Sequence, residues 1–364
     1  MSNLQQADAG VGEPAGGEGR PFSTADVTLA VMNYNGADRL PALFESIQSL
    51  NAAPAAVMIV DDGSTDGGAE AIREQYPGVR IESMGRNTGL LNRVRNRAFE
   101  TADTPLVFIV DNDVVLKPDT LDQLLHVMNE RPRAAACITR TVYWHDQDRI
   151  YQDGQTLHYV GASPGTNRER LVQELDTEPR LSIGWGVQLI DREAAREVGF
   201  FNPAYPMGWG DDGEFNHKLH LYGYECYHVP KSVVLHKRES GSKRYQGTIQ
   251  NRLRFILEMY QLRTIMLSLP AFFLYELSLV SFLAMKGAAG DYFRGWLTFL
   301  RETPDIMKVR RRIQSSRKVP DRELMGAGDI FVYSDEMTSK LLVHGYRVLN
   351  LLLNGYWRLI VRLI

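Results

Sequence analysis

Cysteine is scarce in this chain of 364 residues, which contains only Cys137 and Cys226. Two cysteines cannot build a disulfide framework or a zinc site with several thiolate ligands, so we expect a reducing compartment. The N-terminus also lacks the basic and then apolar segments of a secretory leader. Residues 1–25 are rich in Gly, Ala and Glu, and we expect them to form a disordered tail.

Glycine-rich phosphate-binding loops are missing as well. Neither a G-x-x-x-x-G-K-[ST] nor a G-x-G-x-x-G motif follows the first predicted strand, Val27–Met32. Both motifs bind phosphate through backbone N–H groups where a helix begins. If the chain binds a nucleotide, we therefore expect its diphosphate to contact a metal ion and arginine side chains.

The sequence does contain a series of short apolar runs that end in polar turn residues. Apolar residues at helical spacing separate these runs, for example over Asp38–Leu50. Strands that alternate with helices predict right-handed βαβ units, and hence an α/β fold with a Rossmann-like, mostly parallel central sheet and flanking helices. The runs predicted as strands are Val27–Met32, Ala56–Val60, Val79–Ser83 and Leu106–Val110.

Two carboxylates, Asp111 and Asp113, directly follow the last of these runs. Ligands of open α/β sheets bind beyond the carboxyl ends of the strands. Hard cations such as Mg²⁺ or Mn²⁺ share carboxylate and phosphate oxygens. The pair therefore predicts a divalent cation held against a diphosphate. The alternative is that both acids only cap a helix beginning near Pro118.

Four motifs in order carry a resemblance to a known family: Val31–Gly36 (VMNYNG), Val60–Gly67 (VDDGSTDG), Asn87–Gly89 (NTG) and the D-x-D triplet Asp111–Asp113. Over roughly residues 27–318 the chain resembles family 2 glycosyltransferases of GT-A fold. The resemblance implies a nucleoside-diphosphate sugar as donor.

By this resemblance Tyr34 packs on the base, Asp62 with Asp61 accepts from its N–H groups, Asp111 approaches the ribose and Asp113 binds the metal. Family members commonly have Arg-Asn at a fixed distance after Asn-x-Gly. Here Arg95-Asn96 comes one residue later, so Arg93 stays an alternative to Arg95 at the diphosphate. The nucleotide-binding residues implied in this way are Asn33, Tyr34, Asp61, Asp62, Arg86, Asn87, Arg95, Asp111 and Asn112.

A second acidic pair, Asp211-Asp212, follows Gly208-Trp209-Gly210 and opens a predicted helix. A sugar hydroxyl must lose a proton as it attacks the anomeric carbon, and a nearby carboxylate can accept that proton. The resemblance places the catalytic base at Asp212. We expect Asp211 to cap the helix, which is also the commoner role for any acid at such a position.

Residues from later parts of the chain complete the predicted site. We expect Trp185, Gly186, Trp209 and Asp211 near the donor sugar or the acceptor, with Trp185 and Gly186 in a strand over Ser182–Ile190. His236 ends the run Ser232–Leu235 and is a second candidate metal ligand, although a histidine there is more often a plain polar strand end. Residues 145–181 follow a possible strand, Ala134–Trp144, and either shape acceptor specificity or have no role.

The C-terminal part is basic and apolar. Between Lys231 and Lys318 there are 17 Lys or Arg against 6 Asp or Glu, which favours an anionic membrane surface over nucleic acid as partner. Thr264–Met285 would form a helix of about 33 Å, long enough to span a membrane. Glu276 within it and basic flanks on both sides favour an interfacial helix or a shallow hairpin on the cytoplasmic face instead of a single crossing.

Lys340–Ile364 has the pattern of a basic amphipathic helix, whose apolar face includes Leu349, Leu353 and Trp357. That face is expected to contact either the membrane or the protein's own core or a second copy in a homodimer.

The predicted organisation is a tail (1–25), a GT-A catalytic domain (26–246), a membrane-associating region (247–318) and a C-terminal tail (319–364). The predicted activity is metal-dependent, inverting sugar transfer to a lipid-linked or cell-surface glycan, with dTDP-rhamnose as first donor and a UDP-sugar as alternative. One other hypothesis is a sugar-nucleotide pyrophosphorylase, which would need a glycine-rich loop after the first strand, and the loop Asn33–Gly36 is not glycine-rich. The other is a catalytically silent membrane-peripheral scaffold.

Overall fold

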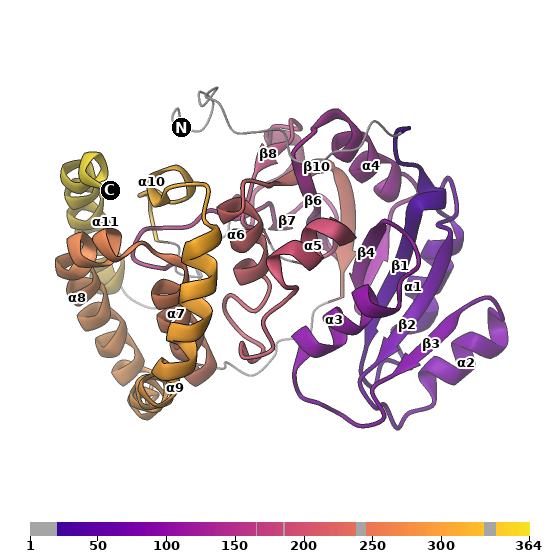
Figure 1. Cartoon of the computed structure of the whole chain (residues 1–364), viewed down its shortest axis with the longest axis horizontal. Helices are drawn as coiled ribbons and strands as arrows, with labels where there is room; N and C mark the ends of the chain where they lie inside the picture. Colours follow the sequence, from indigo (N-terminus) through magenta and orange to yellow (C-terminus); the bar gives the residue numbers. More distant parts are fainter. Residues whose placement is uncertain (1–19, 165, 185, 238–244, 331–339) are drawn as a thin grey trace.

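The computed structural model describes residues 20–164, 166–184, 186–237, 245–330 and 340–364. A mixed sheet with helices on both faces forms most of the molecule, and long helices form its other end (Figure 1). The strands are β1 (Val27–Asn33), β2 (Ala56–Asp61), β3 (Arg80–Ser83), β4 (Leu106–Asp111), β5 (Val114–Leu116), β6 (Ala134–Tyr143), β7 (Ile150–Gln152), β8 (Arg180–Leu181), β9 (Gln188–Asp191) and β10 (Glu225–His236).

The helices of the sheet layers lie between these strands, and the C-terminal helices follow them. The helices of the sheet layers are α1 (Leu40–Gln48), α2 (Gly68–Gln75), α3 (Leu91–Thr101), α4 (Thr120–Glu130), α5 (Arg192–Val198) and α6 (Gly213–Leu221). The C-terminal helices are α7 (Tyr245–Met259), α8 (Leu262–Met285), α9 (Ala289–Ser316), the short α10 (Asp321–Leu324) and α11 (Lys340–Ile360).

The strand order of the sheet is β3-β2-β1-β4-β9-β6-β10-β5. The first four strands are parallel to one another, as the βαβ pattern predicted. Beyond β4 the sheet becomes mixed, because β9 runs antiparallel between β4 and β6 while β10 is parallel to β6. The α/β, Rossmann-like fold with flanking helices is thus confirmed, and its parallel part holds the predicted nucleotide residues.

Two apolar cores cover the two faces of the parallel strands, which explains why these strands read as continuous apolar runs. In β1 the residues alternate, so that Leu29 and Val31 pack with α1 while Ala30 and Met32 pack with α3. The prediction of a strand over Ser182–Ile190 was wrong for its first part, since β9 begins at Gln188. The Ser182 hydroxyl instead holds a loop, accepting from the N–H groups of Gln155 and Gly184.

The core on the α3 side of the sheet, which contains Ala30 and Met32, continues into the C-terminal helices. It includes Phe255 and Met259 of α7 and Leu353 and Trp357 of α11. The hydroxyl of Tyr159, in the segment after β7, donates to the carbonyl of Leu353 (2.9 Å), and its ring stacks on Trp357. The C-terminal helices therefore share a core with the catalytic half; the domain boundaries at 246 and 318 stay predictions.

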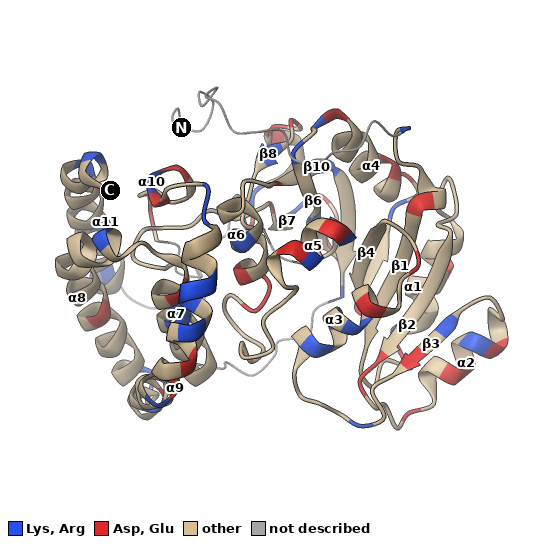
Figure 2. Cartoon of the chain, viewed as in Figure 1, with Lys and Arg blue, Asp and Glu red and all other residues tan. Residues whose placement is uncertain are grey.

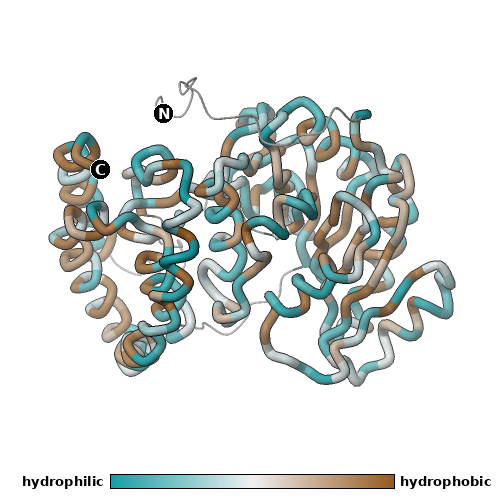
Figure 3. Tube along the Cα trace, viewed as in Figure 1, coloured by the Kyte–Doolittle hydropathy of each residue, from teal (hydrophilic) through white to brown (hydrophobic). Residues whose placement is uncertain are grey.

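Helix α8 lies at the outer end of the molecule, where hydrophobic residues run along it (Figure 3). Among the described residues it is the one helix whose length and composition would allow it to cross a membrane. Its single acid, Glu276, does not face outward. It accepts from the hydroxyl of Tyr292 in α9 (2.7 Å) and pairs with Arg252 of α7.

Candidate functional site

The carboxyl ends of β1, β2 and β4 are joined by side-chain hydrogen bonds of one residue, Asn33. Its Nδ2 donates to Oδ1 of Asp61 (2.8 Å), and its Oδ1 accepts from Nδ2 of Asn112 (2.8 Å). A Cβ on Gly36 would lie 2.4 Å from both amides, so only glycine lets the first loop approach so closely. Three of the predicted nucleotide-binding residues therefore form one connected base for the site.

The two aspartates after β2 hold the neighbouring loops. Asp61 accepts from the backbone N–H (2.8 Å) and the hydroxyl (2.5 Å) of Ser64. Oδ1 of Asp62 accepts from the N–H of Thr88 (2.9 Å). Gly63 has a positive φ of 73° and lies against the backbone of Arg86, where a Cβ would be 2.4 Å away. The loop that carries Arg86 and Asn87 is thereby fixed beside the first one.

The oxygen Oδ2 of Asp62 has no hydrogen-bond partner in the described part of the chain, and the side chains of Arg86 and Asn87 are exposed. The ring of Tyr34 is 46% exposed, which is unusual for a tyrosine beside a buried strand. A planar base stacked on Tyr34 would place its N–H groups toward free acceptors of this kind. The geometry suits the predicted base-binding roles.

A cluster of one arginine and three acids lies between β4 and α6. Arg95 is buried, its guanidinium is 3.1 Å from Oδ2 of Asp211, and it also donates to Asn92 (2.9 Å). Burial raises the pKa of Asp111 to about 6; Arg95 opposes this, and Asp113 and Asp211 add to it. Arg95, which we expected at the diphosphate, is thus engaged with Asp211, whereas Arg93 is exposed.

Asp212, the predicted base, is the N-cap residue of α6 and accepts from the N–H of Gly213 (2.7 Å). The expectation that Asp211 caps this helix was wrong. Asp211 turns to α3 instead, because the buried cation of Arg95 is a stronger partner than a helix N–H. Burial raises the pKa of Asp212 to about 7, with repulsion from Asp211 adding to the effect and Arg95 opposing it.

The two candidate metal ligands face each other across the antiparallel pair β5–β10. Nε2 of His236 lies 3.5 Å from Oδ2 of Asp113, and the Lys237 N–H donates to the Asp113 carbonyl (2.8 Å). The ring of Tyr151 in β7 stacks on His236 at 4.9 Å. Within the described residues no group of three His, Cys, Asp or Glu could hold a metal. One oxygen and one nitrogen donor suit Mg²⁺ or Mn²⁺ only if substrate oxygens complete the ligand set.

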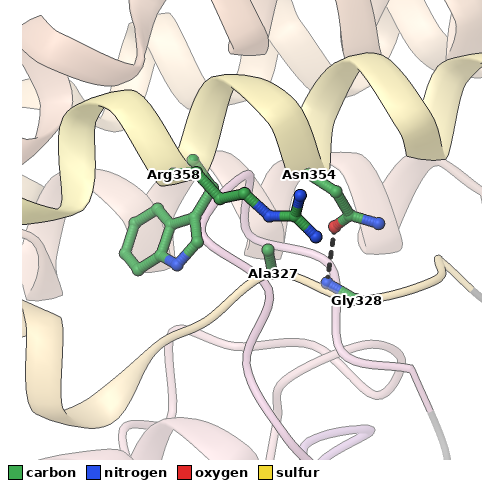
Figure 4. Close-up of a pocket in the computed structure, with 5 residues that line it drawn as sticks. Ala327, Gly328, Asn354 and Arg358 are labelled. Atoms are coloured by element: carbon green, nitrogen blue, oxygen red, sulfur yellow. Dashed lines mark hydrogen bonds between the residues drawn. The ribbon is translucent and has the colours of Figure 1, made fainter. Parts of the chain in front are cut away.

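The remaining predicted residues have mixed outcomes. Trp185 lies outside the described residues, and Gly186 precedes β9 with a positive φ of 92°. Trp209 packs its ring edge-on against Phe255 of α7 (5.3 Å). A shallow pocket lies elsewhere, beside α11, where Asn354 accepts from the Gly328 N–H and Arg358 adds a cation (Figure 4).

Two residues near the acid pair were missed from the sequence. Asn92 is fully buried, and its Nδ2 donates to the carbonyls of Asp211 (2.7 Å) and Asn202 (3.0 Å). Its position three residues before Arg95 on one helix face was the signal that could have found it. Asn251 of α7 contacts the same loop from the other side, and no local sequence signal marks it.

Solved structures place this architecture in a known class. The fold resembles that of GalNAc-T7, crystallised with UDP, GalNAc and Mn²⁺, with a TM-score of 0.56 and 17% identity. The match covers 70% of this chain, which spans about half of that protein (51%). The fold is therefore the GT-A type, an α/β sheet with a parallel Rossmann-like half.

Sequence comparison gives the family. Residues 28–198 match the model of glycosyl transferase family 2. This match spans just under half of the chain and, together with the relatives below, identifies the chain as a glycosyltransferase. The matched range includes Asp62 and Asp113 but ends before Asp212 and His236.

Two curated relatives are bacterial enzymes. The chain is 25% identical over 242 residues to N-acetylglucosaminyl-diphospho-decaprenol L-rhamnosyltransferase of Mycobacterium tuberculosis, covering 59% of this chain and 77% of the relative. It is 25% identical over 229 residues to the glycosyltransferase GlyG of Streptococcus pneumoniae, covering 59% and 72%.

Proposed function

We propose that the chain transfers a sugar from a nucleoside-diphosphate donor to a hydroxyl of a lipid-linked or cell-surface glycan, with inversion at the anomeric carbon. The rhamnosyltransferase relative, named for a lipid-diphosphate-linked acceptor, makes dTDP-rhamnose the first donor to test and a UDP-sugar the second. The polar residues at the ends of β1, β2 and β4 supply the nucleotide-binding surface.

The observation that carries the proposal is the state of Asp212. It is 9% exposed, and among the described residues one neutral backbone N–H is its hydrogen-bond donor. Its pKa, raised to about 7, makes it a stronger base than an ordinary aspartate while leaving it ionised in much of the population at neutral pH.

The reaction is then a single displacement. The acceptor oxygen attacks the anomeric carbon from the face opposite the leaving group, and its proton passes to the Asp212 carboxylate. The bond from the anomeric carbon to the diphosphate oxygen breaks, and the nucleoside diphosphate leaves with the electron pair. Attack from the opposite face inverts the configuration.

Asp113 and His236 would hold a divalent cation, Mg²⁺ or Mn²⁺, which when bound supplies positive charge to the departing diphosphate. Lys237 directly follows His236, and its ammonium group lies over the ring of Trp144, 4.2 Å from the ring centroid. It would add charge to the same end of the donor.

Calorimetric titration with UDP, dTDP and GDP, each with and without Mn²⁺, tests the donor site. We expect one nucleotide to bind tightly in the presence of metal, and Asp113→Ala to abolish the metal-dependent part. Asp119→Ala, which removes an acid near the start of α4, is the control. Equal binding of all nucleotides by wild type and Asp113→Ala, or no binding, would contradict the assignment.

We further propose that the chain works at the cytoplasmic face of the membrane, lying on it rather than crossing it. One stripe of α8 is at least half exposed: Leu262, Met266, Leu269, Phe273 and Leu277. The opposite side of α8 packs on the protein, since Tyr356 of α11 donates to the Leu267 carbonyl (2.8 Å). A helix with one covered face is suited to the interface.

Helix α11 extends this surface in a way the sequence pattern did not indicate. The apolar face predicted from its periodicity, with Leu353 and Trp357, is docked on the protein's own core. A second set of apolar residues, Leu351, Leu352 and Leu359, is exposed beside Arg358. No acid occurs between Lys340 and Ile364, and Figure 2 shows Lys and Arg gathered on the helices nearby. The charge favours an anionic lipid surface.

Vesicle flotation tests this placement. Wild type should float with vesicles containing anionic lipid and less with zwitterionic ones, whereas Phe273→Glu and Leu359→Glu should stay in solution. Ala71→Glu on the exposed side of α2 is the matched control. A wild-type protein that ignores vesicles and forms a dimer disrupted by Phe273→Glu would assign the surface to a second copy instead.

A further inference from the structure

The loop that carries Asp211 and Asp212 runs from α5 to α6 and is held from two sides. On one side α3 contributes Asn92 and Arg95, which bind the carbonyl and the carboxylate of Asp211. On the other side α7 contributes Asn251, whose Nδ2 donates to the carbonyls of Pro206 (2.8 Å) and Trp209 (3.0 Å). The acid pair is thus fixed between the sheet domain and the C-terminal helices.

The contact with α7 is buried and extended. Asn251 is 0% exposed, and both of its donated hydrogen bonds go to this loop. One turn further along α7, Phe255 packs against the ring of Trp209, and Glu258 accepts from the hydroxyl of Tyr205 (2.9 Å). Asn251, Phe255 and Glu258 recur at helical spacing, so they lie on one face of α7, and this face contacts the loop.

Other positions of α7 are tied to the outer helices. Arg252 pairs with Glu276 of α8 and donates to the carbonyl of Val160 (2.8 Å). Arg254 pairs with Glu302 of α9. In Figure 1, α7 lies between the sheet domain and helices α8 and α11. If helices α8 and α9 move, α7 is therefore expected to move with them and to displace the loop that carries Asp211 and Asp212.

We propose that Asn251 is a positioning residue for the acid pair, and that α7 makes the lipid-facing helices part of the catalytic unit rather than a separate anchor. The inference rests on the proposed function of Asp212 as base. Without Asn251, the carbonyls of Pro206 and Trp209 lose this donor and the loop between Tyr205 and Asp211 is free to shift. Among the described residues, the hydrogen bonds donated by Asn251 go to Pro206 and Trp209 and not to the nucleotide-binding residues at β1, β2 and β4, so donor binding should not change.

The test compares Asn251→Leu with Gln250→Leu in the full-length protein. Leucine has the same branched shape and number of side-chain heavy atoms as asparagine, but it is bulkier and has no donor. Gln250 is the preceding residue, also buried, and donates to Glu302 of α9 (2.9 Å) rather than to the loop. Both variants lose one hydrogen-bonding side chain of α7, but only Asn251→Leu releases the acid pair.

We expect kcat of Asn251→Leu to fall about 100-fold, as for an ångström-scale misplacement of a reacting group, with KM for the donor unchanged. Hydrogen exchange should speed up at the amides of residues 207–212 and stay slow in β1 and β4. Gln250→Leu should retain kcat and the slow exchange. Equal losses of kcat in both variants, or unchanged exchange at 207–212 in Asn251→Leu, would overturn the proposal.

Failure of the proposed function gives a different result. Wild type would then transfer no sugar from any donor tested, whereas the exchange measurement would still decide whether Asn251 holds the loop.

Discussion

Two pairs of adjacent aspartates belong to the candidate site and differ in their surroundings. Asp61 and Asp62 accept from neutral groups, among them the amide of Asn33 and the N–H of Thr88. In the second pair Asp211 takes the cation of Arg95, and Asp212 accepts from a single neighbouring N–H. The comparison of Asp61, which has three donors, with Asp212 teaches that the donors around an acid, not its sequence context, separate a structural carboxylate from a candidate base.

The largest effect should come from Asp212→Asn. The amide keeps an acceptor for the Gly213 N–H but cannot accept a proton from the acceptor sugar. We expect kcat to fall about 100- to 10,000-fold, the usual contribution of general base catalysis. Nucleotide binding measured by calorimetry should not change. A variant that keeps most of its turnover would remove Asp212 from the mechanism and, with it, the contrast between the two pairs.

The matching change in the first pair, Asp61→Ala, should act on stability. It leaves the Asn33 amide and both donors of Ser64 without their acceptor, at a cost on the order of 3 kcal/mol in the free energy of unfolding. Urea unfolding measures this loss. Asp66→Ala is the control, because Asp66 accepts from the N–H groups of Ala37 and Gly68 but is exposed, so water can replace it. If both variants lost the same free energy of unfolding, the hydrogen bonds of Asp61 would contribute no more to stability than those of an exposed aspartate.

The parallel half of the fold could be predicted because its strands are buried on both faces and read as apolar runs. The same logic located Asn33, Asp61 and Asp111 together, since the carboxyl ends of parallel strands share an edge. Other features depended on distant partners. The antiparallel placement of β9 and the capture of Asp211 by Arg95 have no local signal.

Helix α11 shows a different limit of sequence reasoning. Apolar residues occupy more than half of its circumference, so periodicity alone could not tell which set docks on the core. The structure buries Leu353 and Trp357 and leaves Leu351 and Leu359 exposed. Tertiary packing by Tyr159 decides between the two faces.

The smallest expected effect is a pH dependence of stability that comes from Asp212. Because burial raises the pKa of Asp212 in the folded state to about 7, the folded protein holds this proton more tightly than the unfolded chain does. That contribution to stability is present below about pH 4 and is lost as the pH rises toward 7. Asparagine cannot ionise, so Asp212→Asn should be more stable than wild type at pH 8, by about 1–2 kcal/mol.

At pH 4 the two proteins should unfold at the same urea concentration, since Asp212 is then protonated in the folded state and increasingly so in the unfolded one. If Asp212→Asn were less stable than wild type at pH 8, the carboxylate would be stabilising its site. Asp212 would then resemble Asp61, and the argument that its surroundings prepare it as a base would fail.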